Sequence, residues 1–475
     1  MSRHAIDQPA TDLVIEEIAK YVSEYEIHSR LAWETSHYCL LDSLGCAFEA
    51  LGVPECTKLI GPIVSGTVTP LGARIPGTSY VTDPICATFG TGVLVRWVDY
   101  SDAFYAQTVI HPSDTFSGIL AVADWLSRNH TDTPFIVRDV LGAAIQAYEI
   151  MGWLALENNF TRTGLDNTFL GKIALAAVVT KMLGGTHGEI ANAVSNAFID
   201  GHALSTFRRV QTGSRKSWAA ADAASRGVML AYMTVKGEMG YPSALTAKKW
   251  GFYDVLFEGK SFVFSRPLET FITENVIFKI SYPAALQAQT AVEAAIQLHP
   301  QVKGRLNEIE RIELWTHETC ILMIDKSGAL HNFADRDHCL QYMVAIGLIF
   351  GELDAHHYSD NVAADARIDT LRLKMTVTED LRYSREYLET DKRTNANAVR
   401  VHFKDGTSTE RAEVLYPLGH RARRAEATPL LLRKFERNVS RVFADKRTKT
   451  ILAACAHREH LEQMPVHKFI DLIAM

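Results

Sequence analysis

The stretch RWVDYSDAFYAQTVIHPSDTFSG, residues 96–118, decides how this chain is organised. Apolar segments typical of buried helices flank it, TFGTGVLVRWV before it and GILAVADWL after it. Between them lie Asp99, Asp102, His111 and Asp114. Ionisable groups between two core helices need either a polar cavity or solvent to receive them. The stretch is therefore one wall of a site or a polar surface loop, and alone it leaves both interpretations open.

His111 precedes Pro112, and a residue before proline is biased away from helical geometry. We therefore expect His111 in a loop, directly before a helix that Ser113 or Asp114 caps. Free N–H groups at the start of such a helix suit an anionic ligand.

Composition indicates an ordinary globular protein. The chain has 475 residues, enough for two or three domains, with 47% hydrophobic and 22% charged residues. The net charge of −6 comes without a basic domain, so we expect no nucleic acid partner. No apolar run is long enough to span a bilayer, and the N-terminal residues lack the pattern of a signal peptide. We expect no membrane partner and a cytoplasmic location.

Motifs for cofactors are missing from the sequence. The seven cysteines are scattered, with no CxxC pair that would build a zinc or iron–sulfur site locally, so buried free thiols are expected. No GxGxxG, Walker A, GxSxG or HExxH pattern occurs. We expect neither a metal nor an organic cofactor.

The order of hydrophobic patterns predicts a mainly α fold. Helical periodicity dominates up to about Gly237, beginning with a helix after Thr11 or Asp12 that places Leu13 on its apolar stripe. Ser29 is expected to cap the next helix, which runs towards Gly52.

Strand patterns then appear in EIERIELWTH, DTLRLKMTVTED and NAVRVHFKDGTSTERAEVLYP, the last with a Lys-Asp-Gly hairpin turn. The helical segment DHCLQYMVAIGLIFG separates the first two. We expect a large all-helical domain, residues 1–269, with residues 419–475 packing back on it, and a smaller α+β lid domain, residues 270–418.

A second polar cluster, FRRVQTGSRKSW, holds Arg208, Arg209, Arg215 and Lys216. Guanidinium groups bind carboxylates with two hydrogen bonds, and lysine supplies a movable charge. A solvated basic loop is the alternative, but the Ala-rich helix that Lys216 begins looks buried.

A third cluster, NFADRDHCLQY, offers acid, base and carboxylate-binding groups that include His338 and Tyr342. A helix cap with an Asp–Arg ion pair explains it equally well. Together the three clusters suit elimination or decarboxylation of a small polyacid without a cofactor.

At these same residues the chain resembles the MmgE/PrpD family, and within it the 2-methylcitrate dehydratases. The matching stretches include RWVDYSDAF, IHPSDTFSGILAVADWLSRN, ENNFTRTGLDNTFLGK, TGSRKSWAAADAASRGV, ENVIFKIS and NFADRDHCLQYMVAI. The resemblance implies a helical domain with an α+β lid, a homodimer, and a metal-independent hydro-lyase acting on a tricarboxylic acid in the cleft.

The resemblance also implies which residues form the site. The family's active-site positions fall on Asp99, His111, Lys216 and Tyr342. Around them we expect substrate-binding roles for these polar residues: Asp102, Ser113, Asn167, Arg208, Arg209, Arg215 and His338.

This chain departs from relatives within the expected site. Ala103 stands where relatives commonly have threonine, and Asn167 and Arg209 stand where histidine is typical. The segment before His111 is also more apolar. We therefore expect loss of water from a 2-alkylcitrate, either 2-methylcitrate or a longer-chain homologue such as those of secondary metabolism. A cis-aconitate decarboxylase-like lyase and a non-catalytic polyacid-binding protein are the alternatives.

Overall fold

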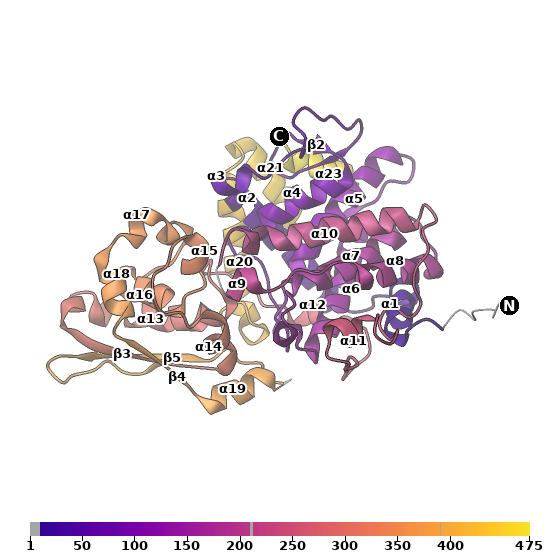
Figure 1. Cartoon of the computed structure of the whole chain (residues 1–475). Helices are drawn as coiled ribbons and strands as arrows, with labels where there is room; N and C mark the ends of the chain where they lie inside the picture. The colour runs from indigo at the N-terminus through magenta and orange to yellow at the C-terminus, as the bar shows by residue number, and fades with distance from the viewer. Residues whose placement is uncertain (1–9, 210–211, 390) are drawn as a thin grey trace.

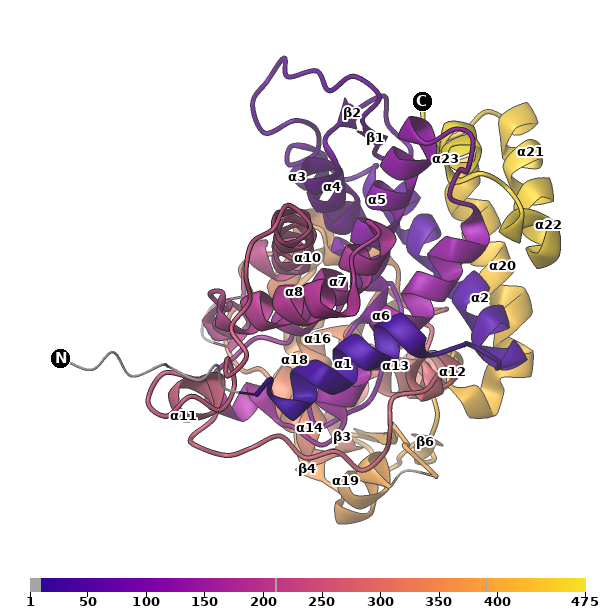
Figure 2. The same cartoon turned by 90° about the vertical axis from the view of Figure 1, so that its right-hand side faces the viewer.

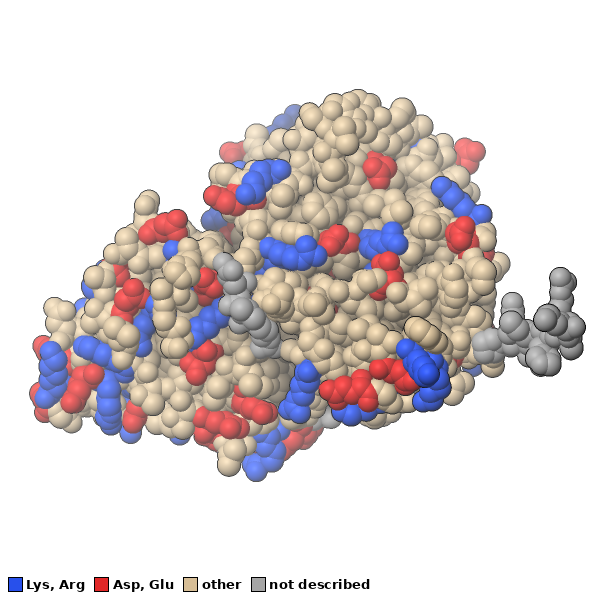
Figure 3. All heavy atoms as spheres, viewed as in Figure 1, with Lys and Arg blue, Asp and Glu red and all other residues tan. Residues whose placement is uncertain are grey.

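The computed structural model describes residues 10–209, 212–389 and 391–475; the side chain of Arg209 also lies outside the described part. Helices dominate, and a smaller α+β part lies beside the helical body (Figure 1). Within the described residues, no helix has both the length and the apolar character needed to cross a bilayer. Lys and Arg alternate with Asp and Glu over the face shown in Figure 3.

The helical body is built from long helices and several short ones. The long helices are α1 (Leu13–Glu24), α2 (Arg30–Ala50), α4 (Pro84–Arg96), α5 (Phe116–Asn129), α6 (Val137–Leu156), α7 (Thr168–Met182), α8 (His187–Ile199) and α10 (Arg215–Thr234). The short elements are α3 (Pro54–Thr57), β1 (Ala73–Arg74), β2 (Val81–Thr82), α9 (Thr206–Arg209), α11 (Phe252–Leu256) and α12 (Phe271–Asn275). The C-terminal helices are α20 (Arg424–Ser440), α21 (Asp445–Ala456), α22 (Arg458–Glu462) and α23 (Val466–Ile473). Helix α20 packs on α2, α22 on α6 and α23 on α5, and α21 packs on the other three (Figure 2).

Helix α7 lies at the centre of this body because it is apolar on all sides. It packs against α6, α8 and α10. Gly227 of α10 permits the close approach, since a Cβ there would lie 2.6 Å from the carbonyl oxygen of Lys172. Lys216 and its neighbours at the start of α10 are thereby held against the core.

Local capping follows the sequence in one helix and departs from it in another. Ser29 accepts a hydrogen bond from the Ala32 N–H at 3.2 Å, as predicted. Asp12 precedes α1, but its carboxylate accepts from the Leu245 N–H at 2.7 Å instead of capping its own helix. Leu13 is 81% exposed, so its predicted place on the buried stripe is wrong. Ile15, together with later residues of α1, faces the core instead.

The α+β part contains a four-stranded sheet in the order β4-β3-β5-β6. The strands are β3 (Ile309–Thr316), β4 (Met375–Glu379), β5 (Asn397–Phe403) and β6 (Ala412–Val414). Its helices include α13 (Gln289–Val302), α14 (Glu318–Ile324), α15 (Phe333–Arg336), α16 (Leu340–Phe350), α17 (Asp360–Ala363), α18 (Ala366–Arg372) and α19 (Leu381–Leu388). Strand β3 pairs parallel with β4 and antiparallel with β5, and α13 packs between the sheet and α16.

The predicted strand DTLRLKMTVTED is wrong in its first half. Helix α18 covers this part, and β4 begins only at Met375. Asp365 caps α18 by accepting from the Arg367 N–H at 2.9 Å, and Ile368 and Leu371 bury one helical face. A helical spacing of three residues therefore overrides the β-branched composition.

Buried apolar residues form two large clusters. One contains residues between Val14 and Ile280 together with the C-terminal helices from Ala427 onward. The other runs from Ala284 to Val414. The chain passes between them at residues 281–283 and 415–426, and a cavity lies where the two parts face each other.

Candidate active site

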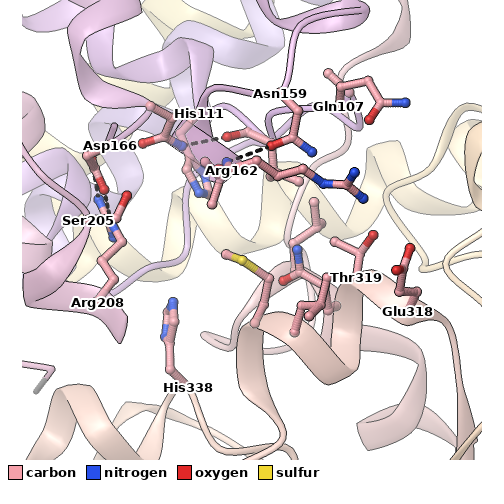
Figure 4. Close-up of a pocket in the computed structure, with 18 of the residues that line it drawn as sticks. Gln107, His111, Asn159, Arg162, Asp166, Ser205, Arg208, Glu318, Thr319 and His338 are labelled. Carbon is pink, nitrogen blue, oxygen red and sulfur yellow. Dashed lines mark hydrogen bonds and ion pairs between the residues drawn. The ribbon is translucent and has the colours of Figure 1, made fainter. Parts of the chain in front are cut away.

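A cavity of about 490 Å³ lies between the helical body and the α+β part. His111 and Arg208 approach it from the helical body, and His338 approaches from the α+β part (Figure 4). Arg96 and Asp99 also line it. Polar side chains from both parts therefore converge on one space of the size that binds small molecules.

Asp99 carries the densest set of contacts. It follows α4 with a backbone φ of 49°, a value uncommon for a residue other than glycine, and it is 1% exposed. Arg96 Nη1 donates to its Oδ1 at 2.6 Å, and Lys279 Nζ lies 2.9 Å from the same oxygen. Burial alone would raise the pKa of Asp99, but Lys279, Lys216 and Arg96 hold it well below its usual value. Asp99 is therefore an anion whose charge is balanced by fixed cations.

Lys216 links this carboxylate to a second one. Its Nζ donates to Asp337 Oδ2 at 2.7 Å and lies 3.9 Å from Asp99 Oδ2. The Nδ1 atom of His338 lies 2.8 Å from Asp337 Oδ1 and 3.2 Å from Lys216 Nζ. Burial and Lys216 lower the pKa of His338 to about 4, so this ring is neutral at pH 7. Lys216, Asp337 and His338 together join the start of α10 to the segment between α15 and α16.

His111 is held as a neutral imidazole of one tautomer. Its Nδ1 lies 2.9 Å from the carbonyl oxygen of Asp102, and because a carbonyl only accepts, Nδ1 carries the proton. Burial, then Arg96 and Lys279, lower the pKa of His111 well below its usual value. The lone pair is therefore on Nε2, and the ring is neutral at pH 7.

Asp102 and Ser113 support the His111 loop rather than line the cavity. The Asp102 carboxylate accepts from the Ser113 N–H at 3.0 Å and from the Tyr148 hydroxyl at 2.8 Å. Burial raises the pKa of Asp102. His111 lies in a loop with φ −121°, as predicted, but Ser113 and Asp114 lie inside a 3₁₀ turn, Pro112–Thr115, and do not cap α5. Pro112 starts this turn. The Asp102 carboxylate accepts a hydrogen bond from the Ser113 N–H, the free donor at the start of the turn.

Arg208 and Asn167 line the cavity. Arg208 Nε donates to Asp166 Oδ2 at 2.6 Å, and Asn167 Nδ2 donates to the Val109 carbonyl oxygen at 2.5 Å. The predicted site residue Arg209 ends α9, and its side chain lies outside the described residues.

Arg215 and Tyr342 are not brought to the cavity. Arg215 is half-buried, its guanidinium lies 3.3 Å from the Asp222 carboxylate, and it stacks over the Trp218 ring. The Tyr342 hydroxyl donates to the His357 carbonyl oxygen at 2.7 Å inside the second core cluster, and burial raises the pKa of Tyr342 to about 12. Neither side chain is therefore placed to touch a molecule bound in the cavity.

Sequence reasoning missed Arg96 and Lys279 and left Asp337 without a specific role. Each of the two cations interrupts an apolar run, VLVRWV and VIFKIS, and a buried charge in such a run needs a partner. The sequence thus indicates that Arg96 and Lys279 each need a buried partner, but it does not indicate which residue that partner is.

Lys434 of α20 fixes the backbone next to Asp99 and at Lys279. Its Nζ donates to the carbonyl oxygens of Tyr100 at 2.7 Å and Lys279 at 2.8 Å, and to the Asp42 carboxylate at 2.8 Å. It is 4% exposed. Although burial disfavours its charge, Asp42 holds the pKa of Lys434 above its usual value. One ammonium thus joins the residues after Asp99 to the segment that carries Lys279.

Metal-ligand atoms come together at two places among the described residues. One is Asp99, Asp337 and His338, and the other is Asp354 with the neighbouring His356 and His357. In the first group both carboxylates already pair with lysine ammonium groups. A divalent cation there would be repelled by these charges, so the donor set fits a charge-balanced polar cluster better than a metal site.

Comparisons with known proteins cover almost the whole chain. The MmgE/PrpD N-terminal domain matches residues 16–265, and the MmgE/PrpD C-terminal domain matches residues 282–458. The 2-methylcitrate dehydratases of Escherichia coli (strain K12) and Cupriavidus necator are each 52% identical, over 98% of both chains. The mitochondrial 2-methylcitrate dehydratase of Yarrowia lipolytica is 49% identical, over 98% of this chain and 91% of its own length. This chain belongs to the MmgE/PrpD family.

Proposed function

We propose that this protein removes water from a 2-alkylcitrate, 2-methylcitrate or a longer-chain homologue, to give the 2-alkyl-cis-aconitate. The observation that carries the proposal is the neutral His111 beside a buried cluster of two carboxylates and three cations, in a cavity that both parts of the chain line. The names and the near-complete coverage of the relatives support the same reaction and assign the protein to the carbon–oxygen lyases.

The reaction breaks a C–H bond next to a carboxylate and the C–O bond of the tertiary hydroxyl. His111 Nε2 takes the proton, because its lone pair is free, whereas Arg96 and Lys279 already bind the Asp99 carboxylate. The C–H electrons form the double bond as the hydroxyl leaves. The hydroxyl departs as water: it takes the proton of the neutral His338 ring, which lines the cavity, and the Lys216 ammonium, 3.2 Å from His338 Nδ1, replaces that proton.

Negative charge builds up on the substrate carboxylate beside the broken C–H bond. Arg96 lines the cavity, and Lys216 and Lys279 lie directly behind Asp99. These charges are fixed before the substrate binds, so they stabilise the transition state without reorganising.

The decisive experiment follows the conjugated product in the ultraviolet with 2-methylcitrate as substrate. We expect His111→Ala and Lys216→Ala to lower kcat by at least about a hundredfold, within the range for loss of a general base or of fixed charge. Arg311→Gln, a change of an exposed side chain on β3, is the control. Wild-type rates in both site variants would refute the proposal, and carbon dioxide released from cis-aconitate would favour the decarboxylase instead.

The alkyl group has an apolar surface available to it. Ala106 and Val109, from the segment that departs from relatives, line the cavity opposite Leu286, Met323 and Leu388. This lining supports a substrate with a longer alkyl group than methyl. A screen of 2-alkylcitrates of increasing chain length tests it, and a preference for 2-methylcitrate over every homologue would exclude it.

We propose a homodimer as the working assembly. The segment between α3 and β1 extends away from the body (Figure 2) and exposes Ile63, Val64 and Val68 at 77%, 69% and 80%. Exposed apolar side chains grouped in this way favour burial against another surface. Light scattering coupled to size exclusion tests this, and a monomeric mass at micromolar concentration would refute it.

The cytoplasm is the proposed location. All seven cysteines are free thiols, and six of them are buried, which fits a reducing compartment. Fractionation of the source cells with an antibody to the protein tests the location.

A further inference from the structure

Arg162 lies at the mouth of the cavity on a rigid backbone. It belongs to the 3₁₀ turn Phe160–Thr163, whose first residue is fully buried among aromatic rings. The Asn159 side chain accepts from the Arg162 N–H at 3.1 Å, and Gly164 ends the turn with φ 85°. Arg162 itself is exposed and lines the cavity, with its side chain directed across towards Thr319 and Glu318 (Figure 4).

Arg162 differs from the other guanidinium groups of the cavity in its partners. Arg96 pairs with Asp99 and Asp114, and Arg208 pairs with Asp166. Among the described residues that line the cavity, Arg162 is the arginine without a carboxylate in ion-pair distance. Its five donors remain available for a carboxylate from outside the protein.

The three carboxylates of a 2-alkylcitrate differ in the reaction. Two of them end on the carbons of the new double bond, next to the buried cluster. The third is on the CH2 arm, and its charge does not change between substrate and product. The Asp99 cluster lies at the buried end of the cavity and Arg162 at its open end, so a substrate that reacts at the cluster directs its CH2 arm towards Arg162.

We propose that Arg162 binds the carboxylate of the substrate's CH2 arm. Neutral donors surround it, since Gln107, Asn159 and Thr161 line the same end of the cavity. Glu318 faces it from the α+β part and repels a carboxylate that enters in another position. This inference rests on the proposed dehydration and names the residue that orients its substrate.

The proposal makes a specific kinetic prediction. Because the CH2 carboxylate keeps its charge throughout the reaction, Arg162 binds substrate and transition state equally. Arg162→Gln therefore raises KM for 2-methylcitrate at least about tenfold and leaves kcat within about threefold, whereas Arg162→Lys causes a smaller rise. Arg311→Gln, an exposed arginine far along the sheet, is the matched control and keeps both constants.

A truncated substrate separates orientation from other effects. In 2,3-dimethylmalate a methyl group replaces the CH2 carboxylate arm. We expect Arg162→Gln and wild type to process or bind 2,3-dimethylmalate equally, measured as kcat/KM or as an inhibition constant against 2-methylcitrate. An unchanged KM for 2-methylcitrate, or equal losses on both compounds, would overturn the inference while wild-type turnover still supports the reaction. No turnover of any 2-alkylcitrate by wild type would instead overturn the proposed function.

Discussion

Lys279 Nζ lies 2.9 Å from Asp99 Oδ1 and 2.9 Å from the carbonyl oxygen of the same residue, across a sequence separation of 180 positions. One ammonium therefore neutralises the carboxylate and fixes the backbone that presents it. Asp99 has a positive φ, and both contacts help to hold it in that conformation.

The charge of Lys279 predicts an alkaline limit to activity. Burial lowers the pKa of Lys279 to about 8, against the attraction of Asp99. Below pH 8 the lysine is an ammonium, and above pH 8 it loses its proton and the cluster loses a positive charge. We expect kcat/KM for 2-methylcitrate to fall as pH rises through about 8. In Lys279→Arg the decline moves to higher pH, because arginine stays protonated. An identical decline in wild type and Lys279→Arg would assign it to another group.

Removing the Tyr342 hydroxyl separates structure from catalysis. The hydroxyl contacts the His357 carbonyl oxygen and not the cavity. Tyr342→Phe leaves that carbonyl without its partner, so we expect a loss of about 1–3 kcal/mol in the free energy of unfolding. We expect kcat to stay within about twofold, since the residue does not touch the reacting atoms. Denaturant unfolding and steady-state rates measure the two effects, and a hundredfold loss of kcat would restore the catalytic role expected from sequence.

Substitutions at Lys434 and Asp42 are expected to change the free energy of unfolding and the turnover rate to different extents. Lys434→Met leaves Asp42 as a buried unpaired charge and costs about 3–5 kcal/mol of unfolding free energy. The double change Asp42→Leu with Lys434→Met removes both charges, so we expect most of that stability to return. Turnover does not return, because the carbonyl oxygens of Tyr100 and Lys279 have lost their common donor. Recovery of full kcat in the double variant would show that Lys434 acts on stability alone.

Val109 predicts a change in chain-length preference. Its side chain lines the cavity, and the Asn167 amide fixes its carbonyl oxygen. Val109→Phe fills space there, so we expect kcat/KM to fall at least about tenfold for the longest accepted 2-alkylcitrate and much less for 2-methylcitrate. Competition between two homologues in one reaction gives this ratio directly. Equal losses on both would place the alkyl group elsewhere.

Local patterns in the sequence predicted the helices and most strands well. Capping by Ser29, the non-helical geometry of His111 before Pro112 and the hairpin after Phe403 depend on neighbouring residues, and all three are present. The first half of DTLRLKMTVTED is wrong because β-branched residues and a helical spacing occur together there, and only packing decides between them.

The polar cluster could be predicted only in part. Asp99, His111 and Lys216 stand out by their residue types, whereas Lys279 becomes recognisable only through its contact with a residue far away in sequence. Tyr342 shows the converse, since a hydroxyl next to a polar segment has its hydrogen-bond partner, the His357 carbonyl oxygen, inside the protein. Partner identity depends on tertiary distance, which a single sequence does not contain.

The place of Lys434 in the chain has a consequence for synthesis on the ribosome. The helical body begins to form from its first helices, since chains fold from the N-terminus as they emerge. Yet the donor that joins the Tyr100 and Lys279 backbones belongs to α20, within the last tenth of the sequence. Until that helix has emerged, Asp42 lacks its ion-pair partner and the Lys279 carbonyl oxygen lacks its donor, so a nascent chain that ends before α20 contains the described cavity residues without the complete backbone support of the site. Emergence of α20, rather than synthesis of the cavity residues, is therefore the step that completes the site.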